Sequence, residues 1–441
     1  MKLSTIQSTL SELAMEPSKS LGQNFLHDQN LATWIVAQLD LKPEDHLVEI
    51  GPGLGALTEF ALPLCGSATL IEKDGRLAGY LQSRHTGDRA PQILHMDALD
   101  YDPRELFPQV PVKLLGNLPY YVTSPILFKF TAAPSPVSRL VLTMQRELAE
   151  RLSAKPRTKD YGALTLVIQR CWNVSYLRTL PGSVFIPAPK VDSAVVMLTP
   201  RPPGELQECD GDFFNRIVKQ GFSQRRKQLR KMLAEYNLDW PATAGELGIS
   251  ETARAEELNL EQWIRMATII RPPDQTKAQD VHGERFDVVD ENNIVTGTAS
   301  RHEVHTRHLM HRAVHIFVFN KSGELFLQKR SKWKDAHPSK WDSSASGHVN
   351  AGDGFDETAG REVLEELGVR ADVEFIGKIA ACKNTGNEFV QLYKALHEGP
   401  FVLPRAEIEC GSFFPMPVIR KWIEKRPEDF ATGFLECFQL V

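Results

Sequence analysis

Groups suited to chemistry on an aromatic amine occur together in the tetrapeptide Asn117-Leu118-Pro119-Tyr120. The Asn117 carboxamide and the Leu118 carbonyl can accept hydrogen bonds from an amino group, and the Tyr120 ring gives a flat base a stacking surface. Such acceptors favour a more tetrahedral amine nitrogen, which is otherwise a poor nucleophile because its lone pair is delocalised into the ring. The pattern indicates methyl transfer to an exocyclic amino group, although an isolated tetrapeptide of this kind is more often a turn that closes a strand.

A ligand-binding turn is predicted at Gly51, where the apolar run 47–50 enters a glycine-rich stretch followed by a helix over 56–64. Glycines let the backbone approach a ligand closely, and the helix presents a positive N-terminus. Glu72 ends the next strand, 21 residues after Gly51, at the spacing at which a carboxylate can bind both hydroxyls of a ribose. A further strand ends at Asp97, where an acceptor can meet an adenine amino group.

Two classes of enzyme fit this pattern, a dinucleotide dehydrogenase and an S-adenosylmethionine-dependent methyltransferase. The stretch 117–120 favours the methyltransferase, because hydride transfer has no use for a base-stacking tetrapeptide. The elements that position these residues are predicted to form a mostly parallel sheet, since short apolar runs alternate with longer helical patterns in residues 1–200. These runs are 47–50, 68–72, 93–96, 114–115 and 139–143.

The 441 residues are too many for one ordinary core and predict two or three domains. We expect an α/β fold in which a Rossmann-like methyltransferase domain over 1–200 is followed by a small helical domain over 201–271. A polar, proline-containing linker over 272–284 is predicted next. Strand-like runs then resume and predict a second α/β module over 285–441.

The formal net charge of −5 conceals a basic middle part of the chain. Residues 1–120 sum to −6, residues 121–231 to +10 and residues 232–441 to −9. A basic segment within an acidic chain indicates that a polyanion binds there. The densest basic stretch is predicted to be helical, and its cationic residues are Arg225, Arg226, Lys227, Arg230 and Lys231.

Composition excludes several classes of protein. No apolar run approaches the roughly 20 residues that span a bilayer, and no secretory signal opens the chain, so we expect no membrane partner. The six cysteines are scattered and form no CxxC pair, which argues against a zinc site or a disulfide framework. We therefore expect a soluble, cytoplasmic protein, and a monomer.

Residues 15–270 resemble the bacterial small-subunit ribosomal RNA adenine dimethyltransferases in an ordered series of motifs. The motifs are 19–26, 48–59, Glu72, Asp97, 116–121 and 185–194. The resemblance implies that S-adenosyl-L-methionine is the cofactor and that its site comprises Asn24, Leu26, Gly51, Glu72, Asp97 and Asn117. It also implies that the Asn117 side chain and the Leu118 carbonyl position the target amine, while Tyr120 and Phe185 sandwich a flipped adenine.

The substrate implied by this resemblance is a pair of adjacent adenosines in the hairpin near the 3′ end of 16S rRNA. They would be dimethylated at N6 in the small ribosomal subunit, with a role in subunit biogenesis, and the basic stretch 225–231 would contact RNA phosphates. Erm-type methyltransferases, which modify 23S rRNA, share the scaffold but usually have Ile where this chain has Leu118. The run 185–194 and the helical domain favour the small-subunit enzyme, and a ribosome-assembly binding factor is a further alternative.

A second cluster of chemical groups is predicted on a helix that contains Glu362, Glu365 and Glu366. Their spacing places all three carboxylates on one helix face. Like charges crowded in this way repel unless a cation binds between them, and oxygen ligands favour Mg²⁺ or Mn²⁺. A solvated acidic helix is the ordinary alternative. The pattern G-x5-D-x7-REVLEELGV over residues 347–369 resembles the Nudix box, which favours the metal site.

The Nudix resemblance implies an α/β/α domain in which Arg361 orients a glutamate and the acidic face holds metal against a diphosphate. The chain has Asp353 where the family normally has Glu. The runs 311–319 and 325–330 resemble the isopentenyl-diphosphate-isomerase-like branch, whose catalytic cysteine is replaced here by Ser346. Those isomerases also lack the full glutamate set, so we expect hydrolysis of a nucleoside diphosphate derivative, with a catalytically idle binding domain as the alternative.

Histidines are frequent in the part of this module that precedes the glutamate helix. A metal-binding tract is disfavoured because the surrounding residues alternate as in a strand. The residues concerned are His302, His305, His308, His311 and His315.

Overall fold

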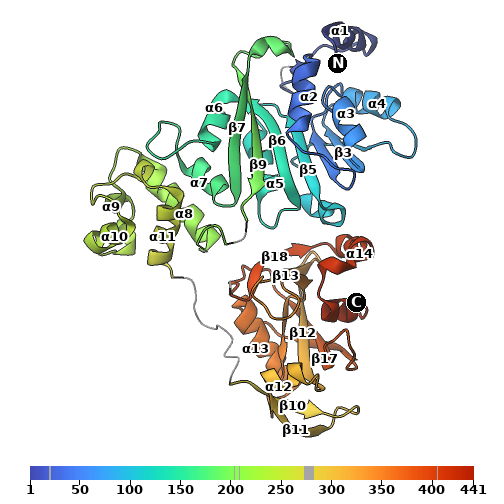
Figure 1. The fold of residues 1–441 in the computed structure, drawn as a ribbon, viewed down its shortest axis with the longest axis vertical. Coiled ribbons are helices and arrows are strands. Elements are labelled where there is room, and N and C mark those ends of the chain that lie inside the picture. Colours follow the sequence, from blue (N-terminus) through green and yellow to red (C-terminus); the bar gives the residue numbers. More distant parts are fainter. Residues whose placement is uncertain (19–20, 203, 208, 273–282, 405) are drawn as a thin grey trace. The chain divides into compact units, whose positions relative to one another are not determined.

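A computed structural model describes residues 1–18, 21–202, 204–207, 209–272, 283–404 and 406–441 (Figure 1). The chain forms two compact units, residues 1–273 and 274–441, and each is described by itself. Lys19 and Ser20 of the first predicted motif, and residues 273–282 of the predicted linker, lie outside the described residues.

The first unit is built on a seven-stranded sheet with the strand order β4-β3-β2-β5-β6-β9-β7. Strands β4, β3, β2, β5 and β6 are parallel to one another, whereas β9 runs antiparallel to both of its neighbours, β6 and β7. This arrangement confirms the predicted Rossmann-like α/β fold. The strands are β2 (His46–Ile50), β3 (Ser67–Glu72), β4 (Gln92–His95), β5 (Val112–Asn117), β6 (Val137–Gln145), β7 (Trp172–Leu180) and β9 (Ser193–Pro200). A separate antiparallel pair joins β1 (Phe25–Leu26) to β8 (Phe185–Ile186).

Helices cover both faces of this sheet. One hydrophobic cluster unites the sheet with apolar residues of α5, α6 and α7, and another unites it with those of α2 and α3. The central strand β2 is buried along its whole length, as expected when a parallel sheet is covered on both faces. The helices are α1 (Leu3–Glu12), α2 (Gln29–Ala37), α3 (Thr58–Ala61), α4 (Gly75–Arg84), α5 (Thr123–Thr131), α6 (Arg146–Leu152) and α7 (Ala163–Gln169).

The register of the parallel strands decides which residues meet at the edge of the sheet. Ile50 is opposite both Ile71 on β3 and Gly116 on β5. The residues that follow each of them, Gly51, Glu72 and Asn117, therefore emerge side by side at the carboxyl ends of the strands.

The helical part of this unit is continuous with the sheet part. It contains α8 (Gly211–Gly221), α9 (Leu229–Met232), α10 (Trp240–Leu247) and α11 (Leu260–Ile270). Asp210 caps α8 by accepting hydrogen bonds from the backbone of residues 212 and 213. Tyr161 and Leu166, which precede residue 200, belong to the same hydrophobic core as these helices, and the Tyr161 hydroxyl donates to the Leu258 carbonyl at 2.9 Å.

The predicted helix over the basic stretch 225–231 is wrong. A short 3-10 helix ends at Gln224, a turn follows, and α9 begins only at Leu229. The backbone is held out of the helix because the Leu229 amide donates to the Ala253 carbonyl, while residue 228 forms a bridge with residue 254. The buried Leu229 side chain anchors this segment, so that Arg225, Arg226 and Lys227 lie on the turn and Arg230 and Lys231 lie on α9.

The second unit contains a seven-stranded mixed sheet in which β12 and β17 pair in parallel. The strands are β12 (His311–Phe319), β13 (Leu325–Arg330), β14 (Trp341–Asp342), β15 (Ala345–His348), β16 (Glu374–Ile379), β17 (Glu388–Leu396) and β18 (Ile408–Phe414), with a separate hairpin of β10 (Arg285–Val289) and β11 (Val295–Ser300). The helices are α12 (Arg301–Thr306), α13 (Phe355–Leu367), α14 (Met416–Lys425) and α15 (Thr432–Phe438). Ala359, Val363 and Leu367 pack α13 on the sheet, and Gly368, with a φ of +71°, ends the helix.

Short 3-10 helices connect several of these elements. They are Leu62–Leu64, Pro103–Gln109, Gly182–Val184, Phe222–Gln224, Ala234–Tyr236, Ala255–Glu257 and Pro427–Asp429. Among the residues that the structure describes, no helix combines the length and apolar character needed to cross a bilayer.

Candidate functional site

The first unit has a cavity at the carboxyl ends of β2 to β5. All six residues predicted to bind the methyl donor line it, namely Asn24, Leu26, Gly51, Glu72, Asp97 and Asn117. They come from five separate segments of the chain, which the strand register brings to one edge of the sheet. The roles of these residues toward a ligand remain a prediction, which the hydrogen bonds and burial of their side chains support.

The carboxylate of Glu72 is buried and held by the backbone. Its Oε2 accepts a hydrogen bond from the Gly53 amide at 3.0 Å, and its Oε1 accepts one from the Asp74 amide at 2.9 Å. Burial raises the pKa of Glu72, and these two hydrogen bonds oppose that shift. Gly53 has a φ of +59°, and a Cβ there would lie 3.2 Å from the Phe25 ring. The turn therefore needs glycine so that its amide can reach the carboxylate.

Asp97 follows β4 and is engaged by a lysine that sequence reasoning missed. Its Oδ1 accepts from the Leu99 amide at 2.9 Å, and its Oδ2 lies 2.6 Å from the Lys73 Nζ. The contact with Lys73 lowers the pKa of Asp97, so this carboxylate is ionised at neutral pH and acts as an acceptor. The available signal was the position of Lys73 directly after Glu72.

The groups of the tetrapeptide 117–120 are each fixed by a separate contact. The Asn117 Nδ2 donates to the Asn24 carbonyl at 3.1 Å, which leaves the amide oxygen as the acceptor. The Leu118 amide donates to the Thr143 carbonyl on the neighbouring strand at 3.1 Å. The Tyr120 hydroxyl lies 2.8 Å from the Ser193 Oγ. Asn117 lines the cavity, whereas Leu118 and Tyr120 are not among its lining residues.

Phe185 is not positioned as the predicted second stacking ring. It pairs with Leu26 in the small β1–β8 sheet and is only 4% exposed, so a base has no access to its faces in this structure. Its ring belongs to a hydrophobic cluster with Leu180 and Val195, and the motif 185–194 therefore supports the cavity wall. Tyr121, which is 57% exposed and lines the cavity, is an aromatic residue that sequence reasoning did not select.

Glu49 is a second buried carboxyl group beside this cavity. It lies on β2, it is fully enclosed, and its Oε2 accepts from the Thr58 Oγ1 at 2.7 Å. Burial raises the pKa of Glu49 from 4.5 to about 7, against the hydrogen bond from Thr58, and the nearby charge of Glu72 adds to the shift.

We expect Glu49→Gln to stabilise the protein at pH 8. The raised pKa means that the folded state holds the proton longer than the unfolded state, so the free energy of unfolding falls as pH rises from about 4.5 through about 7. The loss is on the order of 3 kcal/mol by the usual conversion of pKa shifts. In urea unfolding, the free energy of unfolding of the variant should therefore exceed that of the unaltered protein at pH 8, and the difference should disappear toward pH 4.5.

The matched control for this prediction is Glu44→Gln at an exposed position before the same strand, which should leave the pH dependence unchanged. A free energy of unfolding that is lower in the Glu49→Gln variant by the same amount at pH 5 and at pH 8 would contradict the prediction.

The second unit contains a cavity of about 510 Å³ that is lined by all three predicted glutamates, Glu362, Glu365 and Glu366. Arg361 contacts two of them, with its Nη1 2.9 Å from the Glu362 Oε1 and 3.1 Å from the Glu365 Oε2. Its Nη2 donates to the His348 carbonyl at 3.3 Å, which ties the glutamate helix to the end of β15.

Two of these carboxyl groups are buried and resist ionisation. Burial, with the neighbouring charge of Glu366, raises the pKa of Glu362 well above its ordinary value. Burial also raises the pKa of Glu366 to about 7. The Glu366 Oε2 accepts hydrogen bonds from the Gln328 Nε2 and the Ser346 amide, both at 3.0 Å. A Cβ on Gly347 would lie 2.2 Å from the Glu362 carboxyl carbon, so only glycine leaves room for it.

Four further acids that sequence reasoning missed line this cavity, namely Glu284, Asp342, Glu388 and Glu407. Glu407 lies 41 positions after Glu366 and pairs with Lys334 at 3.0 Å. Asp353, the one departure from the Nudix pattern, is not among the lining residues and accepts instead from the Asn350 side chain at 3.2 Å. The shorter acid therefore leaves the glutamate set unchanged.

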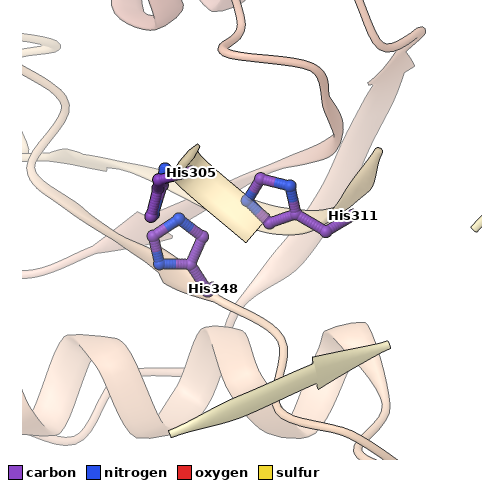
Figure 2. Close-up of side chains that lie close together, drawn as sticks. All are labelled: His305, His311 and His348. Atoms are coloured by element: carbon purple, nitrogen blue, oxygen red, sulfur yellow. The ribbon is translucent and has the colours of Figure 1, made fainter. Parts of the chain in front are cut away.

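Three histidines lie together beside this cavity (Figure 2). His305 and His311 belong to the tract for which sequence analysis disfavoured metal binding, and His348 comes from the Nudix-like motif. Burial lowers the pKa of His348 to about 4. Although burial opposes ionisation of Glu388, contacts with His311 and His348 hold the pKa of Glu388 well below its ordinary value.

The remaining histidines of the tract lie outside this group of three, although His315 also lines the cavity. His302 and His308 are exposed, and the His315 Nδ1 lies 2.6 Å from the Ser343 Oγ.

Comparisons with known proteins agree with this division of the chain. Residues 15–271 match the family model for ribosomal RNA adenine dimethylase, and residues 309–431 match the NUDIX domain. Ribosomal RNA small subunit methyltransferase A of Prosthecochloris aestuarii is 39% identical over 270 residues, covering 61% of this chain and 99% of that protein. The protein of the same name from Syntrophotalea carbinolica is 40% identical over 260 residues, covering 58% and 97%.

Among solved structures, the chain is similar to that of the 23S rRNA methyltransferase ErmE. The two sequences are 26% identical and the TM-score is 0.48, and the match covers 56% of this chain and 99% of ErmE. The family model matches more than half of the chain and spans the donor cavity, the tetrapeptide and the helical part. The chain belongs to the ribosomal RNA adenine dimethylase family and carries a NUDIX domain in residues 309–431.

Proposed function

We propose that the first unit dimethylates the N6 amino groups of adjacent adenosines in the hairpin near the 3′ end of 16S rRNA, with a role in the biogenesis of the small subunit. The observation that carries the proposal is the orientation of Asn117 by its hydrogen bond to the Asn24 carbonyl. This contact leaves the amide oxygen of Asn117, a residue that lines the cavity, as an acceptor, and the carbonyl of Leu118 follows it in the chain. A pair of acceptors at this place suits an amino group that must approach a methyl donor.

The cavity fits S-adenosyl-L-methionine. The buried Glu72 carboxylate keeps lone pairs for two ribose hydroxyls after it has accepted two backbone amides. Asp97 offers an ionised acceptor for an adenine amino group, and the turn at Gly51 lets the backbone come close to the ligand. When bound, the cofactor would supply a methyl group that is already activated on a sulfonium.

The residues of the chain then act by positioning and polarisation. Hydrogen bonds to Asn117 and Leu118 localise the lone pair of the adenine nitrogen and hold it in line for attack. The ring of Tyr120, fixed by Ser193, gives the flipped base one stacking surface. A side-chain general base has no role in this scheme, because the amine loses its proton after the nitrogen has become cationic.

Two observations favour the small-subunit substrate over the 23S rRNA substrate of Erm-type enzymes. The curated relatives with 36–40% identity carry the name ribosomal RNA small subunit methyltransferase A, and this chain spans 89–99% of their length. The helical part, which presents the basic residues, shares a hydrophobic core with Tyr161 and with Leu166 of α7.

We expect Asn117→Ala to reduce methylation of small-subunit particles by roughly 100-fold or more, the cost typical of losing one preorganised group that stabilises developing charge. The measurement is N6,N6-dimethyladenosine formed on 30S particles from cells that lack this protein, with 23S rRNA as a second substrate. Tyr120→Phe is the control, since it keeps the ring and loses only the contact with Ser193.

Full methylation by Asn117→Ala would overturn the proposed chemistry, and methylation of 23S rRNA alone would favour the Erm-type alternative. If the unaltered protein binds 30S particles tightly but leaves them unmethylated, the assembly-factor alternative would be favoured.

The turn around Leu229 is the proposed RNA contact of this unit. Arg225, Arg226, Lys227, Arg230 and Lys231 are all exposed on it or on α9. Arg225 also pairs with Glu256 at 3.0 Å, so its charge is partly compensated. The buried Leu229 anchors the turn, which lets the cations project without weakening the core.

We expect the combined change Arg226→Ala, Lys227→Ala and Lys231→Ala to weaken RNA binding and to flatten its salt dependence. Each lost phosphate contact lowers the slope of log affinity against log salt by about 0.7 to 0.9. Filter binding of 16S rRNA fragments at several salt concentrations measures this. The control pair is Glu251→Ala and Glu261→Ala, at exposed acidic positions of the same helical part. An unchanged slope in the triple variant would exclude this surface.

We propose that the second unit hydrolyses a nucleoside diphosphate derivative with Mg²⁺ or Mn²⁺. The donor set fits such an ion, because three carboxylates of α13 meet Glu407 in one cavity and two of them are too deeply buried to ionise easily without a cation. A bound ion would neutralise phosphate charge and activate water. Arg361 orients Glu362 and Glu365, and Gly347 leaves the space that the Glu362 carboxylate fills.

We expect Glu366→Gln to reduce the rate of Mg²⁺-dependent hydrolysis by roughly 100-fold, the upper end of what the loss of a residue around a metal site costs. The same change should raise the melting temperature in EDTA at pH 8, because the buried charge is removed. A panel of nucleoside diphosphate sugars and dinucleoside polyphosphates provides the substrates. Glu357→Gln on the exposed side of α13 is the matched control. Unchanged hydrolysis would exclude the site, and no hydrolysis by the unaltered protein across the panel would favour an idle binding domain.

A further inference from the structure

We propose that Glu49 makes the first unit bind the cationic methyl donor more tightly than the neutral product that methyl transfer leaves behind. The inference rests on the proposed use of S-adenosyl-L-methionine. This donor carries a sulfonium charge, whereas S-adenosyl-L-homocysteine has an uncharged thioether in the same place and keeps every other group of the donor. A negative group close to the sulfur therefore distinguishes the two molecules, and the position of Glu49 in the sheet suits this role.

The order of the strands indicates where the sulfonium lies. Along the sheet, β4, β3, β2 and β5 are consecutive neighbours. Asp97 follows β4 and Glu72 ends β3, at the proposed places of the adenine and the ribose, while Asn117 ends β5, at the proposed place of the target amine. The methyl group that is transferred has to lie between the ribose and the amine. The sulfonium therefore belongs at β2, the strand that carries Glu49 and pairs with both β3 and β5.

The carboxylate of Glu49 keeps one oxygen available for a ligand. Glu49 lines the donor cavity and is 2% exposed. Its Oε2 accepts from the Thr58 Oγ1 at 2.7 Å, and its Oε1 accepts no hydrogen bond from the described residues. The cavity wall around it includes the buried apolar residues Leu26, Ala56 and Leu57. In such surroundings a carboxylate attracts a cation strongly and is costly to keep ionised without one.

A structural acid in this sheet has a different environment. Asp45, just before the same strand, is buried and lies 2.8 Å from the Lys113 Nζ. Glu49 has no cationic partner among the residues that the structure describes, and burial raises its pKa to about 7. The titratable groups that act on it are Glu72, whose charge adds to this shift, and Cys65. Burial raises the pKa of the Cys65 thiol as well, so that group stays neutral between pH 6 and pH 8.

Donor binding should become tighter as pH rises. A cation near Glu49 favours the ionised carboxylate, so the bound donor lowers the pKa of Glu49 and displaces a proton below about pH 7. Donor affinity should rise by roughly 5- to 10-fold from pH 6 to pH 8, because one pKa unit corresponds to a tenfold change in binding. Glu72 and Asp97 face groups that the donor and the product share, so their titration cancels in the ratio of the two affinities.

Isothermal titration calorimetry of the full-length protein tests this at pH 6 and pH 8. The ligands are the donor, S-adenosyl-L-homocysteine and sinefungin, in which a carbon with a protonated amino group replaces the methylsulfonium. We expect the affinities of the donor and of sinefungin, relative to the product, to rise with pH. In Glu49→Gln the ratio of donor to product affinity should fall by roughly 10-fold at pH 8 and lose its pH dependence. Glu44→Gln, at the exposed position before the same strand, should behave as the unaltered protein does.

A second variant distinguishes this electrostatic role from a structural one. Thr58→Val removes the hydrogen bond that stabilises the ionised carboxylate, and the pKa of Glu49 should rise further. The midpoint of the pH dependence of donor binding should therefore move upward, which a loss of packing does not cause. Titrations in buffers with different ionisation enthalpies should show that the donor releases protons near pH 6.5, whereas the product does not, and that Glu49→Gln abolishes this release.

The outcomes separate this inference from the proposed methyltransferase activity. If Glu49→Gln binds the donor and the product with the same ratio as the unaltered protein at both pH values, the inference is overturned and the proposed activity stands. An equal rise of donor and product affinity with pH would overturn it as well. An unaltered protein that binds neither molecule would exclude both the inference and the proposed cofactor.

Discussion

The register of the parallel strands is the constraint on which the methyltransferase unit depends. Ile50 is opposite both Ile71 and Gly116, so the chain leaves β2, β3 and β5 at one level. Because parallel strands end at the same edge of the sheet, a glycine turn, a buried acid and an amide meet there. The hydrogen bond from Asn117 to the Asn24 carbonyl then joins the segment before α2 to this edge and closes the cavity. A slip of one residue in any of the three strands would separate these groups.

The NUDIX unit is organised by β12 in a comparable way. Its parallel pairing with β17 brings Glu388 to His311, and its antiparallel pairing with β15 brings His348 to the same end. Helix α13 packs on this sheet so closely that the Glu362 carboxylate occupies the space above Gly347. In both units, buried carboxyl groups with raised pKa values lie in the cavity walls. Such groups lower stability near neutral pH, and their burial is a property of the sites rather than of the cores.

Much of the fold could be predicted from local pattern. The apolar runs at 47–50, 68–72, 114–115 and 139–143 each lie within a buried strand, because a sheet covered on both faces requires continuous apolar segments. The helix over the basic stretch 225–231 could not be predicted correctly. Its local composition favours a helix, but the long-range hydrogen bond from Leu229 to Ala253 overrides that preference. The burial of Phe185 could not be predicted for a related reason, since it depends on the long-range pairing of this residue with Leu26.

The sequence by itself determined the residues that have to meet at the two cavities, because glycine turns, strand-terminal acids and the i, i+3, i+4 glutamates are local patterns with a fixed geometry. Only the tertiary structure decided which additional residues join them. Lys73 follows Glu72 directly, yet its contact with Asp97 depends on the pairing of β3 with β4. His305, His311 and His348 are spread over more than 40 positions, and strand register together with the packing of α12 brings their ring nitrogens within 4.8 Å of one another. Such proximity depends on long-range pairing, which local residue spacing does not encode.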